Sequence, residues 1–243
     1  MKKFASFFAV FLFITLFAVA SEAGDRNIPV EVAQLTDSLK KQFAPDRRVA
    51  LLDVDYSFSD KNVMLRGVTT SAEAKNALLK ELARKGYAVM DCLELLPDVK
   101  GLEGKTCGII NVSVANMRVA PDFSSEMMTQ SLMGMPVRVL QRDGWVRIQT
   151  PDNYIAWVHR VGVHPVTEEE MAAWNKAEKI VVTAHYGFVY SEPNQTSQTV
   201  SDVVAGNRLK WEGSKGAFYK VTYPDGRRGY ISKSIAMPEK KWR

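Results

Sequence analysis

Histidine and cysteine, the residues that most often hold metals or act as nucleophiles, are scarce in this sequence. The 243 residues include three histidines and two cysteines. The histidines, at His159, His164 and His185, show no His-Glu-x-x-His motif and no Cys/His spacing of a zinc site. A Gly-rich phosphate-binding loop is also missing. These absences argue against a metal site, a cofactor site and nucleophilic catalysis, so we expect a chain that is not an enzyme.

The sequence also has only a small excess of positive charge. Lys and Arg number 32 and Asp and Glu number 27, which gives a formal net charge of +5 at pH 7. The basic residues are scattered along the chain and form no stripe. Nucleic acid is therefore not an expected partner. The basic end, residues 240–243, is expected to be a solvated tail.

Long hydrophobic runs are limited to one, near the N-terminus. A positively charged start precedes an apolar run over residues 7–17, and small residues follow as far as Ala23. This order is typical of a cleaved secretory signal peptide, here residues 1–23. A membrane anchor is the alternative, but the run is shorter than the roughly 20 residues that span a bilayer. We expect cleavage between Ala20 and Gly24, a periplasmic protein, and no stable membrane span after cleavage.

The two cysteines, Cys92 and Cys107, leave two alternatives open. An oxidising compartment permits a disulfide between them. Closing a loop of this size would add about 3 kcal/mol of stability in the chain-entropy model. Alternatively, each packs as a separate buried thiol, because free cysteine behaves as a small hydrophobic residue.

Residues 27–96 have the patterns of a small domain of mixed helix and strand. Apolar residues recur at helical spacing over residues 32–43, and apolar and polar residues alternate over residues 52–58 as in a strand. A returning strand, a second helix and a third strand follow, which predicts the order αββαβ. That order, with Gly67 ahead of the second helix, resembles the BON domain. Residues 97–107, rich in glycine and charge, are expected to form a linker.

Residues 108–236 contain an internal repeat. The matched pairs are 72 or 73 residues apart: Pro121 and Pro193, Gly134 and Gly206, Trp145 and Phe218, and Asp152 and Asp225. The one-residue change in offset falls in a turn, where insertions are tolerated. Short strands separated by turn residues predict a small barrel or sandwich for each copy, residues 108–166 and 179–238. A capping box that begins at Thr167 predicts a linker helix over residues 167–178.

Short motifs in the repeat resemble those of bacterial SH3 domains. Residues 114–121, Val-Ala-Asn-Met-Arg-Val-Ala-Pro, are similar to the opening Asn-x-Arg-x-x-Pro signature. Residues 144–148, Gly-Trp-Val-Arg-Ile, and residues 229–232, Gly-Tyr-Ile-Ser, are similar to two further strands of that domain. The second copy departs at the opening motif, where residues 186–191 read Tyr-Gly-Phe-Val-Tyr-Ser. The resemblance implies an α+β chain, with the αββαβ domain followed by two all-β SH3-like barrels joined by a short helix.

An SH3–helix–SH3 arrangement resembles the N-terminal half of secreted NlpC-type cysteine peptidases of the cell wall. Residues 121–127 and 148–152 are most similar to members from the Bacteroides group. In that family a catalytic domain with an Asp-Cys-Ser-Gly motif follows. Asp91 and Cys92 match two letters of it, but Leu-Glu comes next, and Cys92 lies in a predicted strand. A nucleophilic role for Cys92 is therefore not expected, and the catalytic domain is taken to be absent from this chain.

Two functions follow from the resemblance. The first is a non-catalytic secreted protein that binds the stem peptides of peptidoglycan, or muropeptides released from it. The alternative is the targeting and substrate-recognition half of a γ-D-glutamyl-L-diamino acid endopeptidase, an NlpC-type cysteine peptidase, whose catalytic domain is a separate partner.

The resemblance also implies a ligand-binding surface on the first SH3 domain, because related peptidases favour stem peptides with a free N-terminal amine. A cationic amine needs a carboxylate, and a cleft wall needs an aromatic ring. Asp122 and Glu126 supply carboxylates in one loop, and Trp145 and Tyr154 supply rings. The second copy has amides in place of both carboxylates, which favours the first copy as the binding unit. The alternative is that Asp122 and Glu126 are solvated loop charges.

Overall fold

The computed structural model describes residues 28–242, so the predicted signal peptide, residues 1–23, lies outside the described residues. The chain divides into two compact units. Unit 1 comprises the residues up to Pro45 and Ala50–Leu95, and unit 2 comprises Asp46–Val49 and the residues from Leu96 onward. Over residues 28–242, no helix is long and apolar enough to cross a membrane.

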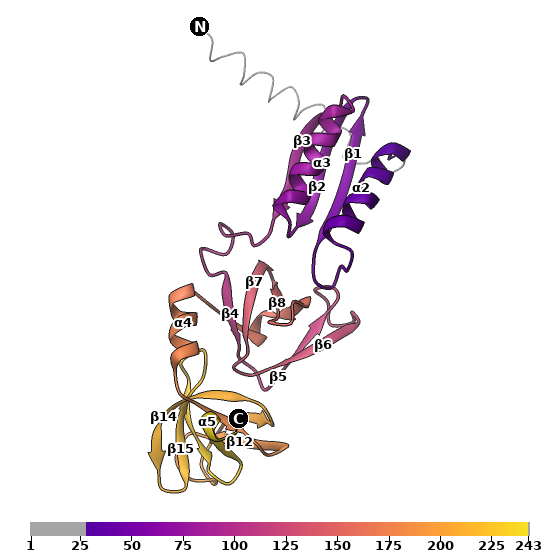
Figure 1. The fold of residues 1–243 in the computed structure, drawn as a ribbon. Coiled ribbons are helices and arrows are strands. Elements are labelled where there is room, and N and C mark those ends of the chain that lie inside the picture. Colours follow the sequence, from indigo (N-terminus) through magenta and orange to yellow (C-terminus); the bar gives the residue numbers. More distant parts are fainter. Residues whose placement is uncertain (1–27, 243) are drawn as a thin grey trace. The chain divides into compact units, whose positions relative to one another are not determined.

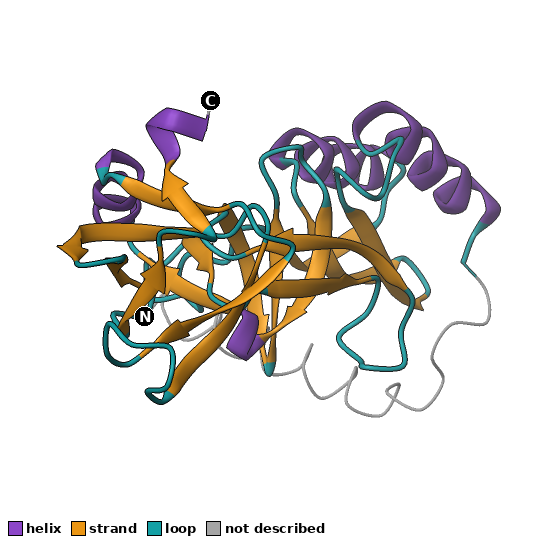
Figure 2. Ribbon diagram, turned by 90° about the horizontal axis from the view of Figure 1, so that it is seen from below, coloured by secondary structure: helices purple, strands orange, loops and turns teal. Residues whose placement is uncertain are grey.

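Unit 1 is a three-stranded sheet with two helices on one of its faces (Figures 1 and 2). Its elements in chain order are α2 (Val30–Phe43), β1 (Leu52–Ser59), β2 (Asn62–Thr69), α3 (Ala72–Arg84) and β3 (Ala88–Leu95). The central strand β2 is antiparallel to β1 and parallel to β3. A parallel pair requires a crossover, and α3 supplies it. Apolar side chains of both helices and all three strands form one core.

Two local signals fix the path from β2 into α3. Gly67 in β2 has a φ of +117°, and a Cβ there would overlap the carbonyl oxygen of Asp53 on β1, so only glycine permits this approach. Ser71 is the N-cap of α3, and its hydroxyl accepts a hydrogen bond from the amide of Ala74. The helix then buries Leu78 against the core.

Unit 2 contains two seven-stranded sheets of the same topology (Figure 1). The first comprises β4 (Cys107–Ile110), β5 (Val114–Arg118), β6 (Met127–Leu132), β7 (Pro136–Asp143), β8 (Trp145–Gln149), β9 (Ile155–His159) and β10 (Val163–Val166), with a 3₁₀ turn at Arg160–Gly162. The second comprises β11 (Lys179–Val182), β12 (Tyr186–Tyr190), β13 (Thr199–Val204), β14 (Arg208–Lys215), β15 (Phe218–Thr222), β16 (Arg228–Ser232) and β17 (Ala236–Pro238), followed by α5 (Glu239–Trp242).

The strand orders of the two sheets correspond one to one. They are β10-β4-β7-β8-β9-β5-β6 and β17-β11-β14-β15-β16-β12-β13, so each strand has its counterpart seven strands later. Each sheet encloses its own core, which includes Val146 and Ile148 in the first and Val189 and Val221 in the second. The repeat predicted from the sequence is therefore also a structural repeat. We call the two sheets the first and the second barrel.

Helix α4 (Glu168–Lys176) joins the two barrels and begins with the predicted capping box. The Thr167 hydroxyl accepts a hydrogen bond from the amide of Glu170 at 3.2 Å, and the Glu170 carboxylate accepts one from the amide of Thr167 at 2.8 Å. The buried residues Met171 and Trp174 pack against Ile109 of the first barrel. The helix is thus attached to the barrel that precedes it.

The expected linker, residues 97–107, is partly built into the first barrel. Leu102 is 3% exposed and belongs to that barrel's core. The amide of Asp98 donates to the carbonyl of Leu140 on β7 at 2.9 Å, and Cys107 already begins β4. The glycine and charge content gave the appearance of a free linker, but one apolar side chain is enough to dock the segment on a nearby core.

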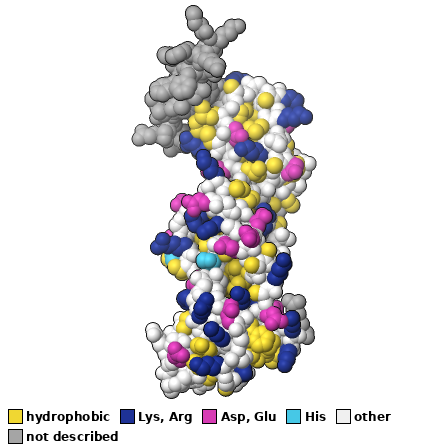
Figure 3. Space-filling model, turned by 90° about the vertical axis from the view of Figure 1, so that its left-hand side faces the viewer, with side chains coloured by type: hydrophobic (Ala, Val, Ile, Leu, Met, Phe, Trp, Pro, Cys, Tyr) yellow, Lys and Arg dark blue, Asp and Glu magenta, His cyan; other side chains and the backbone are white. Residues whose placement is uncertain are grey.

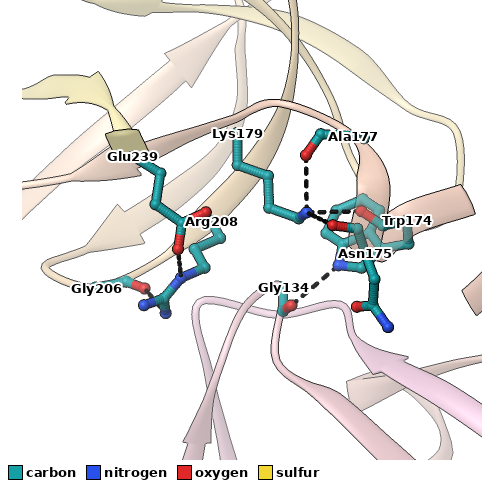
Figure 4. Close-up of polar contacts among 8 residues, drawn as sticks. All are labelled: Gly134, Trp174, Asn175, Ala177, Lys179, Gly206, Arg208 and Glu239. Atoms are coloured by element: carbon teal, nitrogen blue, oxygen red, sulfur yellow. Dashed lines mark hydrogen bonds and ion pairs between the residues drawn. The ribbon is translucent and has the colours of Figure 1, made fainter. Parts of the chain in front are cut away.

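The two barrels meet through backbone and side-chain hydrogen bonds. The amide of Arg208 donates to the carbonyl of Met133 at 3.0 Å. Figure 4 shows the second bond, which the indole of Trp174 donates to the carbonyl of Gly134 at 3.2 Å. Gly134 has a φ of +85°, and a Cβ there would overlap the Arg208 carbonyl oxygen. The side chain of Met133 extends into the core of the second barrel. A glycine at position 134 therefore permits the close contact between the barrels.

A buried lysine closes the C-terminal end of α4. The Lys179 ammonium group donates to the carbonyls of Trp174 at 2.6 Å and Ala177 at 3.0 Å (Figure 4). The Trp174 carbonyl also accepts a hydrogen bond from the amide of Ala177 at 3.2 Å, and a cation at this end interacts favourably with the helix dipole. Lys179 thus fixes the path from the helix into β11.

The structure records both cysteines as free thiols. Cys92 is exposed on β3 of unit 1, which differs from the buried thiol considered from the sequence, and Cys107 is half-buried in unit 2. Burial raises the pKa of the Cys107 thiol. A raised pKa disfavours the thiolate that a nucleophile needs.

Candidate functional site

Three rings meet on the surface of the first barrel, at Phe123, Trp145 and His159. The Phe123 and Trp145 ring centroids are 4.9 Å apart, and that of His159 lies 5.1 Å from Phe123 and 5.3 Å from Trp145. Phe123 is 67% exposed although its side chain is fully apolar. We call this group the aromatic cluster. Exposed rings held together in this way are typical of a recognition surface.

Strand geometry positions two of the three rings. In β8, Val146 and Ile148 are buried, so alternation directs Trp145 outward, as the sequence predicted. His159 ends the neighbouring strand β9 and is paired directly with Trp145 in the antiparallel register. Side chains of directly opposed residues lie on the same face of a sheet. The two rings therefore meet because of the hairpin that joins β8 to β9.

The third ring reaches the cluster from the loop between β5 and β6. The Asp122 carboxylate accepts hydrogen bonds from the amide and the hydroxyl of Ser124, both at 2.6 Å. The Ser125 hydroxyl accepts a further bond from the amide of Ala120 at 3.0 Å. These bonds hold the loop in a defined turn. Phe123, at the apex of this turn, is thereby presented to Trp145.

The electrostatics of this loop suit a cationic ligand group. The hydrogen bonds from Ser124 hold the pKa of the Asp122 carboxyl below its usual range, so this group is ionised at neutral pH. Glu126 lies at the end of the same loop, and its backbone carbonyl accepts a hydrogen bond from the amide of Val119 at 3.1 Å. In the second barrel, Asn194 takes the place of Asp122 and makes the same turn with a neutral amide.

The structure brings some of the predicted site residues together and separates one. Asp122 precedes Phe123 of the aromatic cluster, and Trp145 is a member of it. Tyr154 lies beside Ile155, at the opposite end of the β8–β9 hairpin from the Trp145–His159 pair. Along β8 the two ends, at Trp145 and Gln149, are four residue steps apart, which is about 13 Å at the usual rise per residue. The ring of Tyr154 instead has the Arg48 guanidinium 5.8 Å from its centroid.

Two members of the cluster, Phe123 and His159, were not among the residues predicted from the sequence. A signal for His159 was present, because it occupies the hairpin position opposite Trp145 once the turn is placed. Phe123 had a weaker signal, as a lone ring among polar loop residues. Over residues 28–242, no group of three or more His, Cys, Asp or Glu side chains is arranged to hold a metal ion.

Comparison with known families identifies both barrels. Residues 117–161 match the family described as the bacterial dipeptidyl-peptidase Sh3 domain, and residues 185–235 match the bacterial SH3 domain. The chain therefore carries two bacterial SH3 domains, as the motifs predicted. Both matches lie in unit 2, so the likeness of residues 27–96 to a BON domain stays a prediction. A comparison with curated protein sequences found no match.

The solved structures that match part of this chain include members of the NlpC/P60 family. An NlpC/P60 family protein from Bacillus cereus is 20% identical with a TM-score of 0.45, and the match covers 54% of this chain and 55% of that one. An NlpC/P60 endopeptidase from Photobacterium damselae is 15% identical with a TM-score of 0.43, and the match covers 59% and 35%. NlpC2 from Trichomonas vaginalis is 15% identical with a TM-score of 0.23, covering 54% and 47%. The matched part spans little more than half of the Bacillus protein.

Proposed function

We propose that this chain is a non-catalytic, periplasmic cell-wall protein whose first barrel binds the stem peptides of peptidoglycan. The observation that carries the proposal is the surface cluster of Phe123, Trp145 and His159, in which the exposed Phe123 directly follows Asp122, an ionised carboxylate, in the loop. A stem peptide that has been released from the glycan begins with the free amine of alanine, so it offers a methyl group for the rings and a cation for the carboxylate. Charge-assisted hydrogen bonds of this kind fix orientation as well as affinity. Glu126, in the same loop, offers a second carboxylate.

Tyr154 sets a condition on how such a peptide would lie. Because it stands at the opposite end of the β8–β9 hairpin, a ligand that touches both Trp145 and Tyr154 must extend along that hairpin. A short peptide held at the aromatic cluster would leave Tyr154 unperturbed. The proposal therefore places the amine end of the ligand at the cluster and gives Tyr154 a role only for longer ligands.

A titration with a stem tripeptide, L-Ala-γ-D-Glu-diaminopimelate, followed by NMR on the purified protein tests this proposal. We expect shifts at Trp145, His159 and the loop at Asp122. Phe123→Ala and Asp122→Asn should each weaken binding by about tenfold, as expected for the loss of a central contact. The matched control is Asn194→Ala, which removes the equivalent turn bond in the second barrel and should leave binding unchanged. Shifts confined to the second barrel would contradict the proposal.

The alternative function is the substrate-recognition half of a cell-wall endopeptidase that acts with a separate catalytic domain. The match of residues 117–161 to a dipeptidyl-peptidase SH3 domain favours it. The two functions share the same binding surface but differ in what the purified chain does alone and with a partner. Release of stem-peptide fragments only after a catalytic domain is added, at a rate lowered by Phe123→Ala, would support the alternative.

A further inference from the structure

A second set of rings lies on the second barrel, along strand β12, where Tyr186 is exposed and Phe188 and Tyr190 are half-buried. Tyr186, Phe188 and Tyr190 alternate with residues that face inward, such as Val189, which is fully buried. The ring centroids are 5.1 Å apart between Tyr186 and Phe188 and 6.4 Å apart between Phe188 and Tyr190. We call these three residues the aromatic row. Successive rings contact one another along the outer face of a single strand.

The aromatic row is not part of the packing that holds the barrel together. Tyr186 is 58% exposed. Among the described residues that form or line the core of the second barrel, none belongs to the row. Large rings lose favourable burial where they remain at the surface, so an exposed ring followed by two half-buried ones on the outer face indicates a surface that a ligand covers.

The internal repeat shows that the fold itself does not require these rings. The first barrel has Val114 at the position of Tyr186 and Asn116 at the position of Phe188, on the equivalent strand β5. Both strands pair with the same neighbours in the two barrels. The aromatic side chains are therefore an addition specific to the second barrel, at the motif where its sequence departs from the SH3 signature.

Basic groups adjoin the row on the neighbouring strands. Tyr230 on β16 is paired directly with Tyr190, and Lys220 on β15 is paired directly with Tyr230, so all three lie on the same face. Arg228, two residues before Tyr230 on β16, is exposed. On β13, the other neighbour of β12, Asp202 is paired with Phe188, and its carboxylate accepts a hydrogen bond from the Ser113 hydroxyl at 2.7 Å. The charges that flank the rings on the β15–β16 side are thus positive.

We infer that the aromatic row of the second barrel binds the glycan strand of the cell wall. Pyranose rings present a face of C–H groups that stacks on aromatic faces, and a row of rings suits an elongated chain of sugars. Where the stem peptides have been removed, the free lactyl carboxylates of the glycan complement Lys220 and Arg228, which fixes the side on which the charged groups lie. This inference rests on the proposed cell-wall function and assigns the glycan to the second barrel and the stem peptide to the first.

The test uses peptide-free glycan strands, in which the lactyl groups end in free carboxylates, titrated by NMR into the protein. We expect shifts on β12, β15 and β16. The double variant Tyr186→Val and Phe188→Asn carries the residues that the first barrel tolerates at these positions, and it should weaken glycan binding by about tenfold. The matched control is Val161→Ala, at a 61% exposed side chain of the first barrel outside both sets of rings, which should leave glycan binding unchanged. Lys220→Gln should also weaken binding, and added salt should do the same to the unaltered protein.

Each outcome separates this inference from the proposed function. Stem-peptide binding without any glycan binding would overturn the inference alone. Glycan binding that the double variant retains within about twofold would overturn the role of the row. Glycan binding without stem-peptide binding would support the inference and contradict the function proposed for the first barrel. The single variant Tyr186→Val, at the most exposed ring, checks that a loss of binding is not a loss of folding, because its thermal unfolding should match that of the unaltered protein.

Discussion

The contact between the two barrels depends on the absence of a side chain at position 134, and a pair of glycine variants isolates this effect. Gly134 and Gly144 both have positive φ, +85° and +65°. A Cβ on Gly144 would meet nothing within 4 Å, whereas a Cβ on Gly134 would overlap the carbonyl oxygen of Arg208. Gly144→Ala thus measures the cost of the backbone conformation, and Gly134→Ala adds the steric clash at the contact between barrels.

The two variants should differ in their free energy of unfolding by the contribution of the hydrogen bonds between the barrels. Placing alanine at positive φ costs roughly 1–2 kcal/mol, and both variants should lose this amount. Gly134→Ala also displaces the hydrogen bond from Arg208 to Met133 and the one from the Trp174 indole to Gly134. Each contributes about 1 kcal/mol, so the free energy of unfolding should fall by roughly 2 kcal/mol more than in Gly144→Ala.

Urea unfolding followed by tryptophan fluorescence measures the difference. All five tryptophans lie in the part of the chain assigned to unit 2, so the signal reports on the barrels. The Trp174 indole resonance should also shift in Gly134→Ala and stay in place in Gly144→Ala. Equal destabilisation by the two variants, with an unchanged Trp174 resonance, would refute the role assigned to Gly134.

Three further predictions concern other parts of the chain. Leu102→Ala should lower the free energy of unfolding of unit 2, measured in urea, by about 2–5 kcal/mol because it removes a core side chain. The control is Val99→Ala in the same segment, where the side chain is 57% exposed and the change should be less than about 0.5 kcal/mol. Burial would raise the pKa of the Asp225 carboxyl, but hydrogen bonds from Asn111 and Arg227 hold this pKa below its ordinary value of 3.8. The carboxylate therefore stabilises the fold above pH 3.8, and this stabilisation is lost as the pH falls through the lower pKa of the folded state. Asn111→Ala should raise the pKa of Asp225, as measured by NMR titration. Mass spectrometry of the exported protein should show a new N-terminus within residues 21–24, and an intact N-terminus would contradict the signal peptide.

Much of the fold was predictable because its signals are local. The capping box at Thr167 places the start of α4 from residues within one turn. Alternation in β8 predicted that Val146 and Ile148 are buried and that Trp145 faces outward. The repeat, read from residues at a fixed offset, correctly indicated two barrels of the same topology. Each of these signals needs only neighbouring residues or a comparison of the sequence with itself.

The candidate site was only partly predictable, because it depends on how segments distant in sequence pack. Trp145 was identified from its strand, but its contact with Phe123 depends on a turn 22 residues earlier that Asp122 and Ser124 form. Tyr154 was grouped with Trp145 on the expectation that the turn after the Trp-bearing strand lies near the first loop, and the hairpin register instead sets the two residues at opposite ends.

The sequence by itself determined where α4 begins, that two copies of one barrel are present, and that the second copy carries rings where the first has Val114 and Asn116. Only the tertiary structure decided that Leu102 belongs to a core, that Gly134 lies at the contact between barrels, and that Phe123 completes a cluster. The physical reason is that the pattern of apolar and polar residues indicates which side of its own helix or strand each residue faces. Contacts between elements also depend on strand register and loop conformation, and this pattern alone does not specify them.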